Sequence, residues 1–242
     1  MLLHSPQLVL PEVDFTMPVQ ELYSTPSPSI SVNSSGYTRS EETANSMSHA
    51  LGVIAGIIGL IFSLIKGQET LTNIQLIGVV IYCASIILLF ACSTLYHSVS
   101  DPALKHKLKI ADHCAIYFLI AGTYTPLMLI ALTGTQAKVI LISIWSLALG
   151  GVLFKTLFIH RFKKFSVALY LIMGWLCMTV INDLISAMSP LGFQLLLTGG
   201  IFYSLGVVFY VGKRIPYNHA IWHLFVLGGA ISHFLCVYLT LI

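Results

Sequence analysis

The stretch IQLIGVVIYCASIILLFACSTLY, residues 74–96, carries no charged side chain and ends directly before His97. A run of about 20 apolar residues is long enough to cross the hydrocarbon core of a bilayer as one helix. Six further segments are similarly long and mostly apolar, so that the full set is 47–65, 74–96, 110–132, 139–159, 165–187, 191–211 and 220–241. The sequence therefore predicts an all-α membrane protein, a seven-transmembrane helix bundle with short loops.

The composition of the whole chain favours the same class. Of the 242 residues, 57% are hydrophobic and only 9% are charged, whereas soluble domains carry about 25% charged residues. The formal net charge of +3 is too small to indicate a nucleic acid as the partner. We therefore expect a membrane protein that does not bind nucleic acid.

The first 45 residues differ in composition from the rest of the chain. They are rich in Ser, Pro, Thr and Asn, and Pro11 and Pro18 interrupt the apolar stretch near the start. Such a segment buries too little apolar surface to fold, and it lacks the basic start of a signal peptide. We expect a disordered tail over 1–39 and a seven-helix membrane domain over 40–242, with Ser40 as the cap of its first helix.

The basic residues predict the orientation in the membrane. With seven crossings, ten of the twelve Lys and Arg residues fall on the side of the N-terminus, and only Lys66 and Lys138 fall on the other. Loops rich in Lys and Arg remain in the cytoplasm. We therefore expect a cytoplasmic N-terminus and an external C-terminus. The ten residues are Arg39, Lys105, Lys107, Lys109, Lys155, Arg161, Lys163, Lys164, Lys213 and Arg214.

Three histidines and one aspartate fall at the cytoplasmic ends of different segments. His97 follows the second segment, Asp112 opens the third, and His219 and His223 open the last. Imidazoles at i and i+4 share one helix face about 5–6 Å apart, a spacing that a metal ion can bridge. Any one of these residues alone would be explained by hydrogen bonds to loops or headgroups. Together they predict a metal site, one ion per chain, with His97, His219 and His223 as ligands.

The type of site suggests its chemistry. Three histidines with an open fourth position are typical of catalytic zinc, which lowers the pKa of a bound water to about 7. Asp112 would act as general base or orient that water, and Ser93, one helical turn before His97, would donate a hydrogen bond to the water or to an oxyanion. Nitrogen ligands also suit copper, iron or nickel, so Zn²⁺ is preferred on availability.

A second polar pattern precedes the first apolar segment. Glu42, Asn45 and His49 form the spacing E-x-x-N-x-x-x-H. The pattern favours a capped helix at the membrane interface, and the alternative is a lid over the metal site or a role beside it.

These motifs together resemble a known family. STLYH at 93–97, DHCAIYFLIAGTYTP at 112–126 and PYNHAIWH at 216–223, with E-x-x-N-x-x-x-H at 42–49, are similar to the hemolysin III family. That family is the bacterial branch of the progestin and adipoQ receptor proteins, within a ceramidase-like group of membrane hydrolases. The resemblance covers about 40–242 and implies seven helices with a cytoplasmic N-terminus. It also implies a zinc site of Ser93, His97, Asp112, His219 and His223, in which the histidines are ligands and the aspartate holds a zinc-bound water.

The resemblance implies a multi-pass protein of the bacterial inner membrane and leaves three functions open. The leading hypothesis is a metal-dependent hydrolase of a lipid amide or ester, whose substrate, a lipid or a lipid-like molecule, comes from the membrane. The alternative is a sensor or regulator of membrane homeostasis with a structural zinc, which needs the same ligands. Cytolytic activity, as the family name suggests, is less favoured, because seven apolar helices without a secretion signal do not suit a released pore-former.

Overall fold

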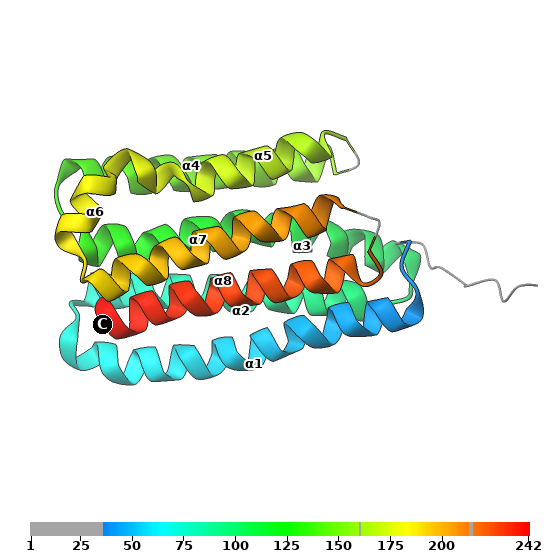
Figure 1. Ribbon diagram of the computed structural model, residues 1–242, viewed down its shortest axis with the longest axis horizontal. Helices are drawn as coiled ribbons and strands as arrows, with labels where there is room; N and C mark the ends of the chain where they lie inside the picture. Colours follow the sequence, from blue (N-terminus) through cyan, green and yellow to red (C-terminus); the bar gives the residue numbers. More distant parts are fainter. Residues whose placement is uncertain (1–35, 160, 213–214) are drawn as a thin grey trace, which may run out of the picture. The chain divides into compact units, whose positions relative to one another are not determined.

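The computed structural model describes residues 36–159, 161–212 and 215–242, and the regular secondary structure in these ranges is helical (Figure 1). Seven spans in the described part of the chain are long and apolar enough to cross a membrane, and each coincides with one expected segment. The prediction of a seven-helix membrane protein is therefore confirmed. Residues 1–35 of the expected tail lie outside the described residues.

The spans are built from eight α-helices and two short irregular turns. They are α1 (Arg39–Thr70), α2 (Asn73–Ser98), α3 (Pro102–Pro126) with a π-helical turn (Leu127–Ala131), α4 (Thr135–Leu157), α5 (Lys163–Gly174) with a 3₁₀ turn (Leu176–Val180) and α6 (Ile181–Ala187), α7 (Pro190–Val211) and α8 (Asn218–Thr240).

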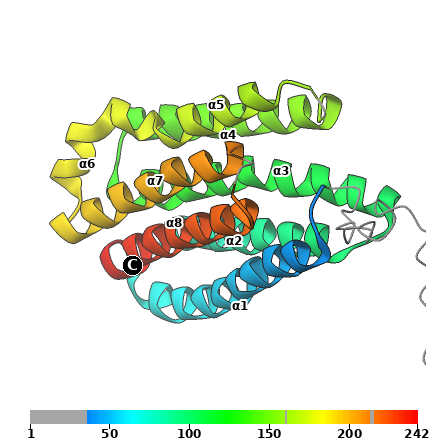
Figure 2. The same cartoon turned by 45° about the vertical axis from the view of Figure 1, so that its right-hand side comes forward.

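The helices are arranged in layers that both cartoon views show. α1 packs against α2 and α8, α2 packs against α3, and α7 packs against α8. α4 and α5 form the outer layer beside α3 and α7, on the opposite side of the bundle from α1 (Figures 1 and 2). The polar ends of α1, α2, α3 and α8 consequently lie near one another at one end of the bundle.

The first helix begins at Arg39, and the expectation that Ser40 caps it is wrong. Thr38 is the N-cap: its hydroxyl accepts from the backbone N–H of Glu41 at 3.2 Å, and the Glu41 carboxylate accepts from the backbone N–H of Thr38 at 2.9 Å. This reciprocal pair needs a Glu or Gln three residues after the cap. Thr38 has one in Glu41, whereas Ser40 has Thr43.

One narrow face of α1 is buried along its whole length. Its members recur at intervals of three or four residues: Glu42, Asn45, His49, Gly52, Gly56, Gly59, Ser63 and Gly67. A Cβ on Gly52 would come within 2.6 Å of the Phe90 ring, so this glycine lets α1 approach α2 closely. The same face that is glycine-rich in the middle of the helix is therefore polar at its N-terminal end.

The fifth span is interrupted in its middle, between α5 and α6. The Tyr124 hydroxyl of α3 donates to the carbonyls of Met173 at 2.9 Å and Gly174 at 3.1 Å, and it accepts from the backbone N–H of Cys177 at 2.7 Å. Backbone groups freed inside a membrane need such partners. One α3 side chain thus stabilises the interruption, which lies beside the cavity described below.

Candidate metal centre and cavity

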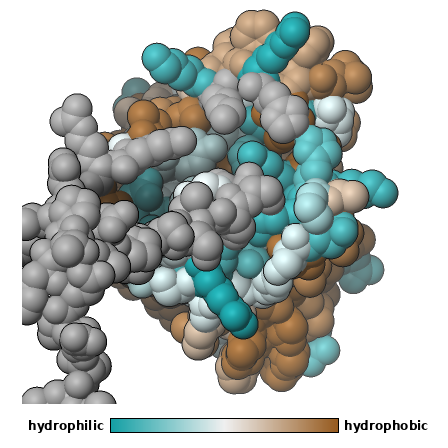
Figure 3. Space-filling model, turned by 90° about the vertical axis from the view of Figure 1, so that its right-hand side faces the viewer, coloured by the Kyte–Doolittle hydropathy of each residue, from teal (hydrophilic) through white to brown (hydrophobic). Residues whose placement is uncertain are grey.

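The polar end of the bundle brings together residues that are far apart in the sequence. Figure 3 shows hydrophilic side chains gathered on this end, with hydrophobic ones around them. The last turn of α2 carries His97, and the first two turns of α8 carry His219 and His223. The start of α1 lies next to both, because Ser46 of α1 is 2.7 Å from Ser98 of α2 and Ser48 is 3.1 Å from His223.

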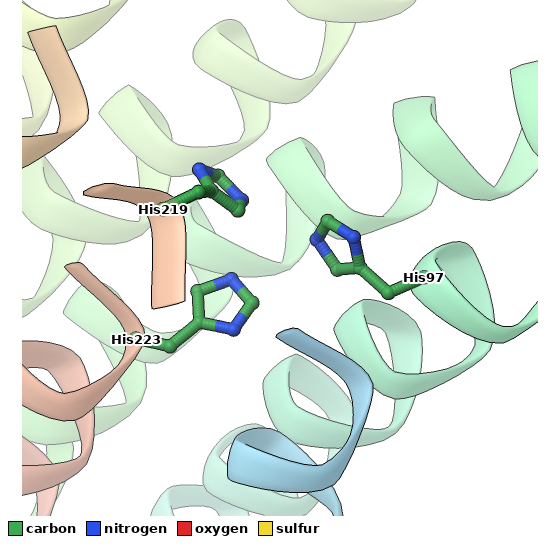
Figure 4. Close-up of side chains that lie close together, drawn as sticks. All are labelled: His97, His219 and His223. Carbon is green, nitrogen blue, oxygen red and sulfur yellow. The ribbon is translucent and has the colours of Figure 1, made fainter. Parts of the chain in front are cut away.

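The three predicted metal ligands lie together. Each of His97, His219 and His223 offers a ring nitrogen, and these nitrogens are all within 4.8 Å of one another. Figure 4 shows the three rings turned toward a common space. His97 and His223 are only 4% and 2% exposed, and His97 Nε2 is buried without a hydrogen-bond partner among the described residues. Such a set of convergent imidazole nitrogens fits zinc or a similar divalent ion.

The turn before α8 places His219. Tyr217 adopts a left-handed conformation with φ of 57°, and its backbone N–H donates to the Glu41 carboxylate at 3.2 Å. The Asn218 amide donates to the carbonyls of Phe209 at 3.0 Å and Gly212 at 2.7 Å, at the end of α7. These bonds hold the start of α8 against α1 and α7, and so they fix the position of the first ligand.

Two groups of α1 lie within hydrogen-bond distance of the Nδ1 atoms of His97 and His223. His223 Nδ1 lies 3.0 Å from the carbonyl oxygen of Asn45, and His97 Nδ1 lies 2.5 Å from Glu42 Oε2. A carbonyl or an ionised carboxylate can only accept, so Nδ1 carries the proton in both rings. The other nitrogen, Nε2, then keeps the lone pair that a metal ion requires.

Glu42 is itself held in place by Lys105 of α3. Lys105 Nζ lies 3.0 Å from Glu42 Oε1 and also donates to the carbonyls of Tyr96 at 2.9 Å and Val99 at 3.1 Å. Both residues are buried: Glu42 is 6% exposed and Lys105 is 5% exposed. A buried carboxylate of this kind needs a paired cation, and Lys105 provides it. The same lysine donates to the free carbonyls at the C-terminal end of α2.

Ser93 and Asp112 lie in different surroundings. Ser93 is fully buried one turn before His97, and its hydroxyl has no hydrogen-bond partner among the described residues. Asp112 begins the membrane part of α3, and its Oδ2 lies 3.1 Å from His113 Nδ1. Asp112 lines the same cavity as His219 and His223, whereas Ser93 is not among the residues that line it.

That cavity extends from the histidines into the bundle. Its volume is about 140 Å³, and its walls come mostly from apolar side chains such as Ile116, Leu119 and Val226. It reaches His233, which is ten residues after His223 on α8, or about 15 Å along a helix that rises 1.5 Å per residue. The cavity is therefore polar at the histidine end and apolar along its length.

At this site one pattern follows the less favoured of two sequence-based alternatives, a position beside the metal site, and two further features were not predicted. The favoured interpretation of Glu42, Asn45 and His49, a capped interfacial helix ahead of the first segment, is wrong, because all three are buried inside α1 beside the histidines. Their spacing of three and four residues continues into the glycine face and is the signal that places them there. No sequence pattern indicated that Lys105 would be buried or that the centroid of the Tyr37 ring would lie 5.1 Å from that of His219.

Comparison with known proteins gives a consistent result. The family described as "Haemolysin-III related" matches residues 37–234, a range that includes every candidate site residue. "Hemolysin-3 homolog" of Bacillus subtilis (strain 168) is 45% identical over 201 residues, which cover 83% of this chain and 94% of that protein. "Hemolysin-3" of Bacillus cereus is 46% identical over 197 residues, or 81% and 90% of the two chains. The human "Monocyte to macrophage differentiation factor" is 32% identical over 206 residues, or 82% and 83%.

Proposed function

The chain belongs to the haemolysin III family. We propose that it is a zinc-dependent membrane hydrolase that cleaves an amide or ester bond of a lipid. The observation that supports the proposal most is the convergence of His97, His219 and His223, because His219 and His223 also line one end of a mostly apolar cavity. A site for a lipid needs both parts, a reactive centre for the polar bond and an apolar space for the chain.

The proposed chemistry divides the work among the residues of the centre. Zinc held by the three imidazoles supplies Lewis acidity, which activates a water near neutral pH and polarises a carbonyl. Asp112 lines the cavity, and its carboxylate takes the proton of the attacking water as general base. Ser93 does not line the cavity itself but lies one turn before His97, and its hydroxyl, which has no partner among the described residues, would donate to the developing oxyanion. The apolar walls exclude bulk water and hold the acyl chain.

The same proposal includes the orientation and the location of the protein. Among the described basic residues, Arg39, Lys107, Lys109 and Lys164 lie in the first turns of spans that begin at the histidine end of the bundle, and Arg161 lies between two spans there. By the distribution of basic residues, this end faces the cytoplasm of a bacterium, in the inner membrane. The substrate would then enter from the cytoplasmic leaflet.

A regulator of membrane homeostasis with a structural zinc is the second candidate. It is favoured by the hydrogen bonds that His97 and His223 donate to α1, because a metal centre linked to three helices would also fix the positions of those helices. A cytolytic role is suggested only by the name "Hemolysin-3" of the Bacillus cereus relative. No contact among the described residues favours a cytolytic role for this chain over the other two.

Metal analysis followed by a lipid-turnover screen tests the leading proposal. Protein purified without chelator should contain about one zinc per chain, and the metal should be lost in His97→Ala, His219→Ala and His223→Ala. Turnover of an amide or ester lipid in the screen should stop with a chelator and return with zinc. Well-folded protein that takes up no metal after zinc addition would contradict the metal centre. Zinc-loaded protein that turns over no lipid in the screen would favour the regulator.

A further inference from the structure

Glu42 joins three helices through one carboxylate. It belongs to α1, its Oε2 contacts His97 Nδ1 of α2 at 2.5 Å, and its Oε1 contacts Lys105 Nζ of α3 at 3.0 Å. The carboxylate is buried and lies on the side of the His97 ring away from the nitrogen that is left for a metal.

The position of the Glu42 carboxylate is fixed by the remaining bonds of Lys105. An ammonium group has three hydrogens to donate, and Lys105 has three acceptors: Glu42 Oε1 and the carbonyls of Tyr96 and Val99. The lysine is thereby held at the C-terminal end of α2, one turn or less from His97. Because one carboxylate oxygen is held by the lysine, the other is oriented toward the imidazole.

The consequence for His97 is a single tautomer. An ionised carboxylate accepts a hydrogen bond and cannot donate one, so the ring proton lies on Nδ1 and the lone pair lies on Nε2. A contact of this kind also makes the ring a better electron donor to a metal and keeps it from rotating. His97 Nε2 is buried and without a partner among the described residues, as this arrangement requires.

We propose that Glu42 is a positioning residue for the metal centre. It contributes no ligand itself, and through His97 Nδ1 it presents Nε2 to a divalent cation that prefers imidazole. The inference rests on the proposed zinc centre for its effect on metal affinity. The tautomer that it predicts for His97 does not depend on metal and can be measured separately.

Glu42→Gln tests the effect on affinity, since glutamine has nearly the same shape and no charge. Removing such a contact typically weakens metal binding by about 10–100-fold, and we expect a loss in this range in zinc titrations against a competing chromophoric chelator. The cobalt(II) form of the variant should also show a shifted visible spectrum. Glu69→Gln is the matched control, because Glu69 is exposed in the last turn of the same helix. Zinc affinity of Glu42→Gln within about twofold of wild type would overturn the proposal.

A double variant separates positioning from simple support of the fold. Glu42→Gln alone leaves the Lys105 charge buried without a carboxylate and could lower the stability. Glu42→Gln combined with Lys105→Met removes both charges, and neutral replacement of a buried pair often restores stability. We expect the double variant to unfold near the wild-type temperature and still to bind zinc about 10-fold or more weakly. Recovery of wild-type zinc affinity would show that the carboxylate serves only the fold, against the proposal.

The metal-free protein distinguishes this inference from the proposed function. With ¹⁵N-labelled histidine, the His97 signals can be assigned by their absence in His97→Asn, and they should report a proton on Nδ1 in wild type and a mixture of tautomers in Glu42→Gln. If wild type shows this dependence but binds no zinc, the zinc hydrolase fails and Glu42 still positions His97. If wild type binds zinc and the tautomer is unchanged in Glu42→Gln, the positioning role fails alone.

Discussion

The His49 ring lies parallel to the ring of His223, with centroids 3.6 Å apart and planes 9° apart. The first ring comes from α1 and the second from α8, so a buried stacking contact joins the first and last helices directly beside the metal centre. Together with the bond from His223 Nδ1 to the Asn45 carbonyl, the stack leaves the ring of this ligand little freedom to rotate.

Because His49 supports His223 by contact, we expect its shape to matter more than its nitrogen atoms. His49→Phe keeps a flat ring in the stack and should retain about one zinc per chain. His49→Ala leaves a cavity and should lower the free energy of unfolding by about 2–5 kcal/mol. Zinc analysis and thermal unfolding in detergent measure the two effects. Loss of zinc in a well-folded His49→Phe variant would instead identify His49 as a fourth ligand.

The sequence predicted the membrane helices and the pairing of two histidines, and it could not predict the contacts between helices. Segments of about 20 apolar residues identify membrane helices because length and hydropathy act locally, and the pairing of His219 with His223 follows from the helical period. The stacking of His49 on His223 and the Glu42–Lys105 pair depend on which helices are neighbours. Helix order in a bundle is set by packing of side chains from distant segments, and no local pattern in the chain encodes it.

We expect the Tyr37 ring to shield the neighbouring histidines, so its removal should speed up metal exchange. Its ring centroid lies 5.1 Å from that of His219 and 6.2 Å from that of His97. Burial raises the pKa of Tyr37 above its ordinary value, so the phenol stays protonated near neutral pH and offers no anionic ligand. In Tyr37→Ala we expect zinc to be lost to excess chelator several times faster. Tyr37→Phe keeps the ring, and a fast loss there would argue against simple coverage.

Two adjacent glycines in α4 give a matched test of helix packing. A Cβ on Gly151 would come within 2.3 Å of the Tyr117 ring of α3, whereas a Cβ on Gly150 would meet no atom within 4 Å. Gly151→Ala should therefore destabilise the protein by about 1–3 kcal/mol through overpacking. Gly150→Ala should be neutral or stabilise it by up to about 1 kcal/mol, since alanine favours a helix. Equal unfolding temperatures for the two variants would mean that α3 and α4 pack less closely than described.

The proposed orientation predicts the location of both chain ends. Reporter fusions to the N-terminus and to the loops after α2, α4 and α7 should report the cytoplasm, and a fusion after Ile242 should report the outside. The physical reason is the excess of Lys and Arg on the first side, ten residues against two. A cytoplasmic C-terminal reporter would require an even number of crossings and would remove the common membrane depth of the four polar site residues.

Asp112→Asn separates catalysis from support of the fold. The substitution keeps the shape of the side chain and its capacity for hydrogen bonds, and it removes the negative charge and the basicity. In the hydrolase, three histidines already hold the metal, so the variant should keep zinc and its unfolding temperature while turnover falls by about 10²-fold or more, the scale of general-base catalysis. In the regulator, the carboxylate matters only as a partner for His113, 3.1 Å away. Asp112→Asn would then support the same cellular phenotype as the wild type. His223→Ala, which lacks one metal ligand, would not support that phenotype. That second pattern would assign the metal to structure and reject the hydrolase.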